Sequence, residues 1–204
     1  MTAISRRGML LGGGALALGF SHGAKAAISI MEPETQPQGQ LVGRALRALD
    51  LHRGSFIYRD MIGIADFTEP SSAPRFYLFD VASGRSRALL VAHGRGSDPG
   101  HSGWVERFSN IPGSAASSAG AYVTGDAYYG KHGLSRRLIG LDPENCNAEA
   151  RAIVIHAASY VNPGIIRERG KLGRSEGCFA FDADDLEHVL GGLGSGRMIY
   201  ADKL

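Results

Sequence analysis

The feature that most constrains the fold is the apolar run RAIVIHAASYV, which covers residues 151–161. It is the most apolar run of the domain and is typical of a strand buried on both faces of a sheet. We expect this strand to end at His156, whose side chain shares one face with Val154 while Ile153 and Ile155 share the other. A strand of this kind needs a layered core, and 204 residues are enough for one domain with such a core.

Short β-like runs broken by Gly, Ser, Asn and Pro surround this strand. Residues 76–81 and 87–93 flank a Ser83-Gly84 turn, which predicts a hairpin. Further strand segments are expected in AGAYVTGDAYYGKHG and SRRLIGLD, and GRMIYADKL is expected to be the last strand. Together with 44% apolar residues and 29 glycines, these runs predict a single mostly-β domain. We expect a β-sandwich or partly closed barrel with one or two peripheral helices.

Two segments have helical periodicity. LVGRALRALDLH would place five apolar residues on one face, namely Leu41, Val42, Ala45, Leu46 and Leu49. We expect an amphipathic helix here, laid against the domain. DADDLEHVLGG begins with Asp N-cap candidates, ends with two glycines and would place Leu186, Val189 and Leu190 on one face.

Residues 1–26 resemble a twin-arginine export signal. Arg6 and Arg7 precede an apolar run, residues 9–20, that is too short to span a bilayer of about 30 Å as a helix. Residues 24–26 then read Ala-Lys-Ala, which suits a signal peptidase. A basic, disordered N-terminus or an uncleaved anchor is the alternative.

Export would place the protein in the periplasm or cell envelope, with membrane contact only during export. Residues 27–40 are rich in Pro and Gln and are expected to be a linker before a domain at residues 41–204. The whole chain has 22 Lys and Arg against 20 Asp and Glu, but residues 1–26 hold three of the basic residues and no acidic one. The remaining balance of 19 against 20 gives a net charge near −1. A nucleic-acid partner is therefore not expected.

Cys178 lies in GRSEGCFAF and is one of two cysteines in the chain. Ser175 and Gly177 before it give a small, flexible turn in which backbone N–H groups can point outward, as the stabilisation of an oxyanion requires. A thiol also needs a base, and His156 at the end of a stiff strand would be held in place for that role. The only histidine after the cysteine is His188, so the order is histidine then cysteine, unlike papain-like peptidases. An inert buried cysteine and a hydrogen-bonded core histidine remain the alternatives.

Other candidate groups are weaker. His93 and His101 flank Asp98, but two histidines in a Gly-Pro loop are more often structural or substrate-lining than metal-binding, so no metal is expected. Cys146 is interpreted as an incidental loop thiol, although a disulfide to Cys178 stays open.

The segment IVIHAASYV followed by GKLGRSEGCFAF resembles the L,D-transpeptidase catalytic domain. The resemblance is greatest to the bacterial branch of murein L,D-transpeptidases, which is related to the YkuD-like enzymes. The signature of that family is a histidine, a spacer and Ser/Thr-x-Gly-Cys, which His156, Ser175, Gly177 and Cys178 match. The resemblance covers roughly residue 41 to the C-terminus.

The resemblance implies a cell-wall acyltransferase that needs no cofactor and no metal. Cys178 would attack the carbonyl of the third residue of a murein stem tetrapeptide, release D-alanine, and pass the acyl group to a neighbouring stem as a 3→3 cross-link. His156 would take the thiol proton, the carbonyl of Ala157 would orient its ring, and the backbone N–H groups of Gly177 and Cys178 would form the oxyanion hole. The family also implies a covalent carbapenem adduct on Cys178.

The partners implied are peptidoglycan stem peptides, and we expect a monomer. Arg174 beside the turn would hold a stem carboxylate, and Tyr129 and His132 are further candidates for substrate binding. Two residues depart from the main branch of the family: Glu176 replaces a histidine and Ala180 replaces an arginine. The spacing of 22 residues from the histidine to the cysteine is also longer than in that branch. The alternatives are an L,D-carboxypeptidase or endopeptidase that hydrolyses the same acyl-enzyme, and a non-catalytic murein-binding domain.

Overall fold

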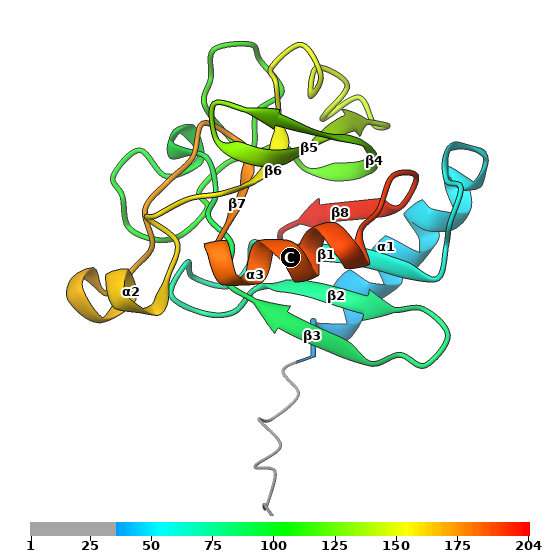
Figure 1. Ribbon diagram of the computed structural model, residues 1–204, viewed down its shortest axis with the longest axis horizontal. Helices are drawn as coiled ribbons and strands as arrows, with labels where there is room; N and C mark the ends of the chain where they lie inside the picture. The colour runs from blue at the N-terminus through cyan, green and yellow to red at the C-terminus, as the bar shows by residue number, and fades with distance from the viewer. Residues whose placement is uncertain (1–35) are drawn as a thin grey trace, which may run out of the picture. The chain divides into compact units, whose positions relative to one another are not determined.

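Eight strands form one mixed sheet in the computed structural model, which describes residues 36–204 (Figure 1). The export signal and most of the linker fall on residues 1–35 and so lie outside the described residues. The strands are β1 (Met61–Asp66), β2 (Phe76–Asp80), β3 (Ser86–Leu89), β4 (Gly120–Gly130), β5 (Gly133–Gly140), β6 (Val154–Ala157), β7 (Phe179–Phe181) and β8 (Met198–Asp202). Their order across the sheet is β3-β2-β1-β8-β4-β5-β6-β7.

Most neighbouring strands are antiparallel, but β1 pairs with β8 and β6 pairs with β7 in parallel. The chain that leaves edge strand β3 reaches the opposite edge of the sheet, where Ala92 bridges Ala180 and Gly94 bridges Ser175. These are isolated bridges, so the sheet is not closed. The prediction of a mostly-β domain is confirmed.

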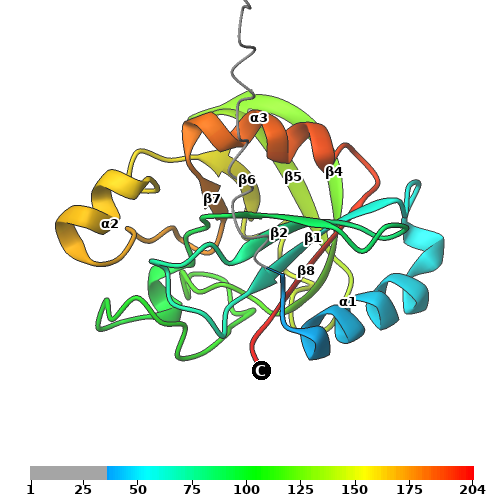
Figure 2. The ribbon, with the colours of Figure 1, turned by 90° about the horizontal axis from the view of Figure 1, so that it is seen from below.

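Three α-helices accompany the sheet: α1 (Gly39–Leu51), α2 (Pro163–Arg169) and α3 (Ala183–Gly192). Two short 3₁₀ turns, η1 (Arg53–Ser55) and η2 (Arg95–Ser97), complete the regular structure. Helices α1 and α3 lie on opposite faces of the strands β1, β2 and β8 (Figure 2). No helix in residues 36–204 is long and apolar enough to cross a membrane.

The alternation of side chains along the strands separates two cores. Ile62 and Ile64 of β1 pack with Leu41 and Leu49 of α1 on one face. The other face holds a cluster rich in phenylalanine that α3 covers with Leu186, Val189 and Leu190. Both helices were predicted. Leu46, which was expected on the buried face of α1, is instead 38% exposed, because the buried residues Leu41, Ala45 and Leu49 recur at a spacing of four and turn it away from the sheet.

The predicted hairpin of β2 and β3 is confirmed, with Phe76 opposite Leu89. Its second strand ends earlier than expected because the chain after Leu89 leaves β2 and approaches β7. Helix α2 was not predicted, although its ends carry local signals. The side chain of Asn162 accepts a hydrogen bond from the backbone N–H of Ile165 (3.0 Å), and Gly170 ends the helix in a left-handed conformation.

Residues 90–119 connect β3 to β4 and contain η2 as their only regular element. A connection of this length inside a domain is uncommon and is usually functional. Here it is hydrogen-bonded to the turn that precedes β7. Ser175 N–H donates to the His93 carbonyl (2.9 Å), and Arg95 N–H donates to the Ser175 carbonyl (2.8 Å).

Candidate active site

Cys178 ends a tight turn that leads directly into β7. Ser175 closes this turn: its hydroxyl accepts from the Gly177 N–H (3.1 Å) and donates to the Cys178 carbonyl (2.8 Å). Gly177 has φ +113°, a conformation that side-chain-bearing residues rarely adopt, and a Cβ added there would lie 2.6 Å from the carbonyl oxygen of Ala116. The shape of the turn therefore depends on Ser175 and Gly177.

The pairing of β6 with β7 brings the histidine to the cysteine. His156 of β6 lies opposite Ala180 of β7, and Cys178 comes just before that strand. The two side chains line one cavity of about 430 Å³. Its full lining is Tyr128, Lys131, His132, Arg151, Ala152, Val154, His156, Tyr160, Arg174, Ser175, Glu176 and Cys178. Of the predicted site residues, this cavity therefore gathers Cys178, His156, Ser175, Arg174 and His132.

The imidazole of His156 is held by two contacts. Its Nδ1 lies 2.8 Å from the carbonyl oxygen of Ala157, and since a carbonyl only accepts, Nδ1 carries the hydrogen. The unprotonated nitrogen of the neutral ring is then Nε2. The ring of His132 stacks on that of His156 with centroids 4.2 Å apart and planes 19° apart. Burial lowers the pKa of His156, the hydrogen bond to Ala157 opposes this, and His132 lowers the pKa further.

The thiol of Cys178 is partly buried and lies 3.6 Å from the carbonyl oxygen of Ala152. Burial raises the pKa of this thiol above its ordinary value, although Val154 N–H, Lys131 and Arg151 favour the thiolate. The pKa of Cys178 is therefore raised and that of His156 lowered. At neutral pH the cavity therefore holds a protonated thiol and a neutral imidazole.

Alkylation should reveal this resting state. Iodoacetamide reacts with the thiolate, so we expect the alkylation rate of Cys178 to be low at pH 7 and to rise about tenfold per pH unit into the alkaline range. The midpoint should lie above the ordinary thiol pKa of 9.0 because the pKa is raised. Mass spectrometry of the Cys178 peptide in a Cys146→Ser background would measure the rate. A rate that is already maximal between pH 6 and 7 would instead indicate a thiolate–imidazolium pair.

The charged groups around the thiol are mainly basic. Lys131, Arg151 and Arg174 line the cavity, against one acidic residue, Glu176. Arg174 donates through Nη1 to the carbonyl of Asp98 and, at 3.4 Å, to that of Pro99, which fixes one side of its guanidinium. The remaining guanidinium donors can serve a ligand with carboxylate groups.

Two expected contacts differ from the arrangement observed. The side chain of Tyr129 is 84% exposed and does not line the cavity, whereas Tyr128, on the opposite face of β4, does. The Gly177 N–H donates to Ser175 Oγ within the turn, so it would have to change partner to reach an oxyanion. Sequence reasoning also did not identify Lys131, Arg151 or Tyr160, which come from separate loops.

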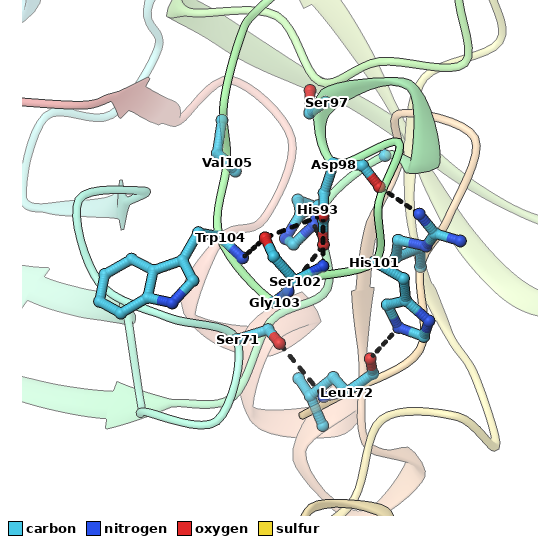
Figure 3. A network of polar contacts seen from close by, with 12 residues as sticks. Ser71, His93, Ser97, Asp98, His101, Ser102, Gly103, Trp104, Val105 and Leu172 are labelled. Atoms are coloured by element: carbon cyan, nitrogen blue, oxygen red, sulfur yellow. Dashed lines mark hydrogen bonds and ion pairs between the residues drawn. The ribbon is translucent and has the colours of Figure 1, made fainter. Parts of the chain in front are cut away.

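A network of polar contacts surrounds His93 and Asp98 (Figure 3). Arg75, His93 and Asp98 are all fully buried. Arg75 Nη2 donates to His93 Nδ1 (2.7 Å), so His93 carries its hydrogen on Nε2 and donates to Asp98 Oδ2 (3.2 Å). Burial and the nearby Arg75 lower the pKa of His93 to about 4, which keeps the ring neutral between the two charges.

Asp98 organises the loop that supports the segment before Cys178. Its carboxylate accepts hydrogen bonds from Ser102 N–H (2.6 Å), Ser102 Oγ (3.0 Å) and Gly103 N–H (2.8 Å) (Figure 3). In the same loop, His101 Nε2 donates to the carbonyl of Leu172 (3.0 Å). The buried Asp98 carboxylate thus fixes a loop with two contacts to the segment before Cys178. His101 of this loop contacts Leu172, and the backbone carbonyl of Asp98 accepts from Arg174.

The residues considered for a metal do not converge in one place. His93 contacts Asp98 whereas His101 contacts the Leu172 carbonyl, and residues 36–204 contain no group of three or more His, Cys, Asp or Glu side chains suited to a metal. Cys146 and Cys178 are both free thiols, so the disulfide left open by the sequence is not formed. Cys146 is exposed and lies outside the cavity.

Fold and site together define a mostly-β domain in which a cysteine and a histidine from neighbouring segments share one cavity. A family model described as the L,D-transpeptidase catalytic domain matches residues 36–201. The chain therefore belongs to the L,D-transpeptidase catalytic domain family. No curated protein matches it.

Solved structures of L,D-transpeptidases and of a cell shape determining protein are distantly similar to this chain. An L,D-transpeptidase from Mycobacterium tuberculosis H37Rv is 12% identical, with a TM-score of 0.44, over 70% of this chain and 57% of that one. An L,D-transpeptidase from Xylanimonas cellulosilytica is 14% identical, with a TM-score of 0.42, over 78% and 69%. The helical cell shape determining protein Pgp2 from Campylobacter jejuni is 13% identical, with a TM-score of 0.44, over 72% and 48%. The matched part is thus little more than half of the Mycobacterium protein and about half of Pgp2.

Proposed function

We propose that this protein is an exported peptidoglycan L,D-transpeptidase that works through a thioester on Cys178. The observation that carries the proposal is the shared cavity of Cys178 and His156, whose other charged side chains are mainly basic. Murein stem peptides carry several carboxylates, which suits such a cavity. The export signal at residues 1–26 and a place in the cell envelope belong to the same proposal, as does action as a monomer without nucleic acid.

In the first half-reaction, the sulfur of Cys178 attacks the carbonyl of the third stem residue. Because the resting thiol is protonated, its proton moves to Nε2 of His156 as the carbon–sulfur bond forms. Ala157 holds Nδ1–H, which keeps Nε2 as the basic nitrogen. The imidazolium then gives the proton to the departing amine of D-alanine. Backbone N–H groups of Gly177 and Cys178 would stabilise the oxyanion, once Gly177 N–H leaves Ser175 Oγ.

In the second half-reaction, the amine of a neighbouring stem attacks the thioester and gives a 3→3 cross-link. Arg174 is the candidate for holding a stem carboxylate, since part of its guanidinium is fixed by backbone carbonyls and part remains available. His132 would contribute by keeping the His156 ring in place through stacking. No step requires a cofactor or a metal.

Products from a defined substrate would test this proposal. The purified protein is incubated with disaccharide-tetrapeptide, and tandem mass spectrometry identifies the products. A dimer joined through the third residues of both stems is the expected result. Tripeptide without dimer would favour the carboxypeptidase alternative, and unchanged substrate would contradict the proposal in favour of a murein-binding domain.

A further inference from the structure

A second cavity adjoins the one that holds Cys178. It has a volume of about 370 Å³ and is lined in part by Arg95, Pro112, Gly113 and Ala115. Arg151 and Glu176 line both cavities. The two cavities therefore meet at Glu176, which stands two residues before the nucleophile.

Three charged side chains line the second cavity: Glu176, Arg95 and Arg151. The first two are exposed, whereas the third is held by hydrogen bonds. Glu176 Oε1 lies 3.2 Å from Arg95 Nη2, and these side chains are 71% and 61% exposed. An ion pair this exposed is weak, so both groups can exchange their contact for one with a ligand. Arg151 is instead fixed by hydrogen bonds from Nη1 to the Ser109 carbonyl (2.8 Å) and to Ser118 Oγ (2.6 Å), and from Nη2 to the Ala116 carbonyl.

Transfer of an acyl group requires two molecules to meet at one carbon. The donor stem would occupy the cavity of Cys178 and His156, so the attacking amine must arrive from another side. The second cavity shares Glu176, which belongs to the turn before Cys178, and Arg151 with the first cavity. Its paired carboxylate and guanidinium match a ligand that carries an ammonium group next to a carboxylate.

We propose that the second cavity binds the acceptor, with Glu176 receiving its ammonium group, Arg95 receiving the adjacent carboxylate and Arg151 contributing a fixed positive charge. This inference rests on the proposed transpeptidase function. It gives Glu176, which replaces the histidine usual in the main branch, a role in selecting an amine over water. Glu176 is a specificity residue in this scheme, whereas bond formation stays with Cys178 and His156.

The bound ammonium group first loses one proton to solvent and becomes a neutral amine. Its nitrogen attacks the thioester carbon, the new carbon–nitrogen bond forms, and the carbon–sulfur bond to Cys178 breaks. The second amine proton passes to Nε2 of His156 and from there to the sulfur, which regenerates the thiol and neutral imidazole.

The test is the ratio of cross-linked dimer to hydrolysed tripeptide that Glu176→Gln produces from disaccharide-tetrapeptide. We expect this ratio to fall about tenfold or more, because the variant loses a charge-assisted contact to the acceptor. The ratio does not depend on how much enzyme is folded. Glu168→Gln is the matched control, since Glu168 forms a similarly exposed ion pair with Arg169 (3.4 Å) outside both cavities, and its ratio should equal that of the wild type.

A second measurement addresses the carboxylate. Glycine and methylamine differ only by that group, and the wild type should transfer the stem acyl group to glycine more efficiently, while Arg95→Gln should reduce this preference. An unchanged dimer-to-tripeptide ratio in Glu176→Gln, or equal use of both amines by the wild type, would overturn the acceptor site while leaving the transpeptidase function in place. Failure of the wild type to release D-alanine would overturn the function itself and this inference with it.

Discussion

Replacing Cys178 by alanine should reduce the release of D-alanine from disaccharide-tetrapeptide by at least about 10⁴-fold, since removal of a covalent nucleophile leaves only binding and oxyanion contacts. His156→Gln should cost roughly 10² to 10⁴-fold, which is the usual contribution of a general base. The double variant should be no less active than Cys178→Ala alone, because the two residues act as one unit. Single-turnover assays of D-alanine release would measure all three rates.

The chain provides its own control for this experiment. Cys146 is the other cysteine, it is exposed, and it lies outside the cavity, so Cys146→Ala should retain full activity. A carbapenem should form a covalent adduct with the wild type and with Cys146→Ala, but not with Cys178→Ala. Undiminished D-alanine release by a correctly folded Cys178→Ala protein would refute the thioester mechanism.

The second large effect is expected on stability. Asp98→Ala should lower the free energy of unfolding by about 3–5 kcal/mol, because it removes a buried carboxylate that, together with Asp66, favours the charged form of the buried Arg75. It also removes the acceptor for His93, Ser102 and Gly103. Urea denaturation followed by circular dichroism would measure the change.

An exposed aspartate serves as the reference for that measurement. Asp50 pairs with Arg59 at 3.4 Å on the surface, and Asp50→Asn should change the free energy of unfolding by less than about 1 kcal/mol. Equal stabilities of Asp98→Ala and Asp50→Asn would mean that the buried network contributes nothing. Asp98→Asn should fall between the two, since an amide keeps the size of the side chain but loses its charge and one acceptor oxygen.

Local patterns predicted the strand that carries His156 and the turn that carries Cys178, but not the short strand β7 that follows the cysteine. The apolar run before His156, the Asp182 cap of α3 and the Ser83-Gly84 turn are all encoded within a few residues, and each appears in the structure. Helix α2 was missed because its seven residues contain only two large apolar side chains, Ile165 and Ile166, and these are adjacent. They therefore form no helical periodicity. The position of β8 between β1 and β4 follows from pairing over long distances, which a local pattern does not contain.

The residues of the cavity also differ in whether a local pattern could identify them. Cys178 and His156 were identified from the residues around them in the sequence. Arg151 and Lys131 line the cavity that holds the thiol only because segments distant in the sequence meet there. The choice between Tyr128 and its neighbour depends on which face of β4 is directed inward. The buried state of Arg75 and Asp98 was unexpected because such residues are almost always exposed unless they are paired within the fold.

The central place of β8 has a consequence for the order of events during synthesis. Of the eight strands of the sheet this one is made last, yet it joins β1 to β4 and so links the two halves of the sheet. Until residues 198–202 have been made, the sheet lacks the strand that pairs with both β1 and β4. Assembly of the domain is therefore late and dominated by contacts distant in sequence, which slows folding. A twin-arginine route, which carries folded proteins, would give such a chain the time to finish before it leaves the cytoplasm.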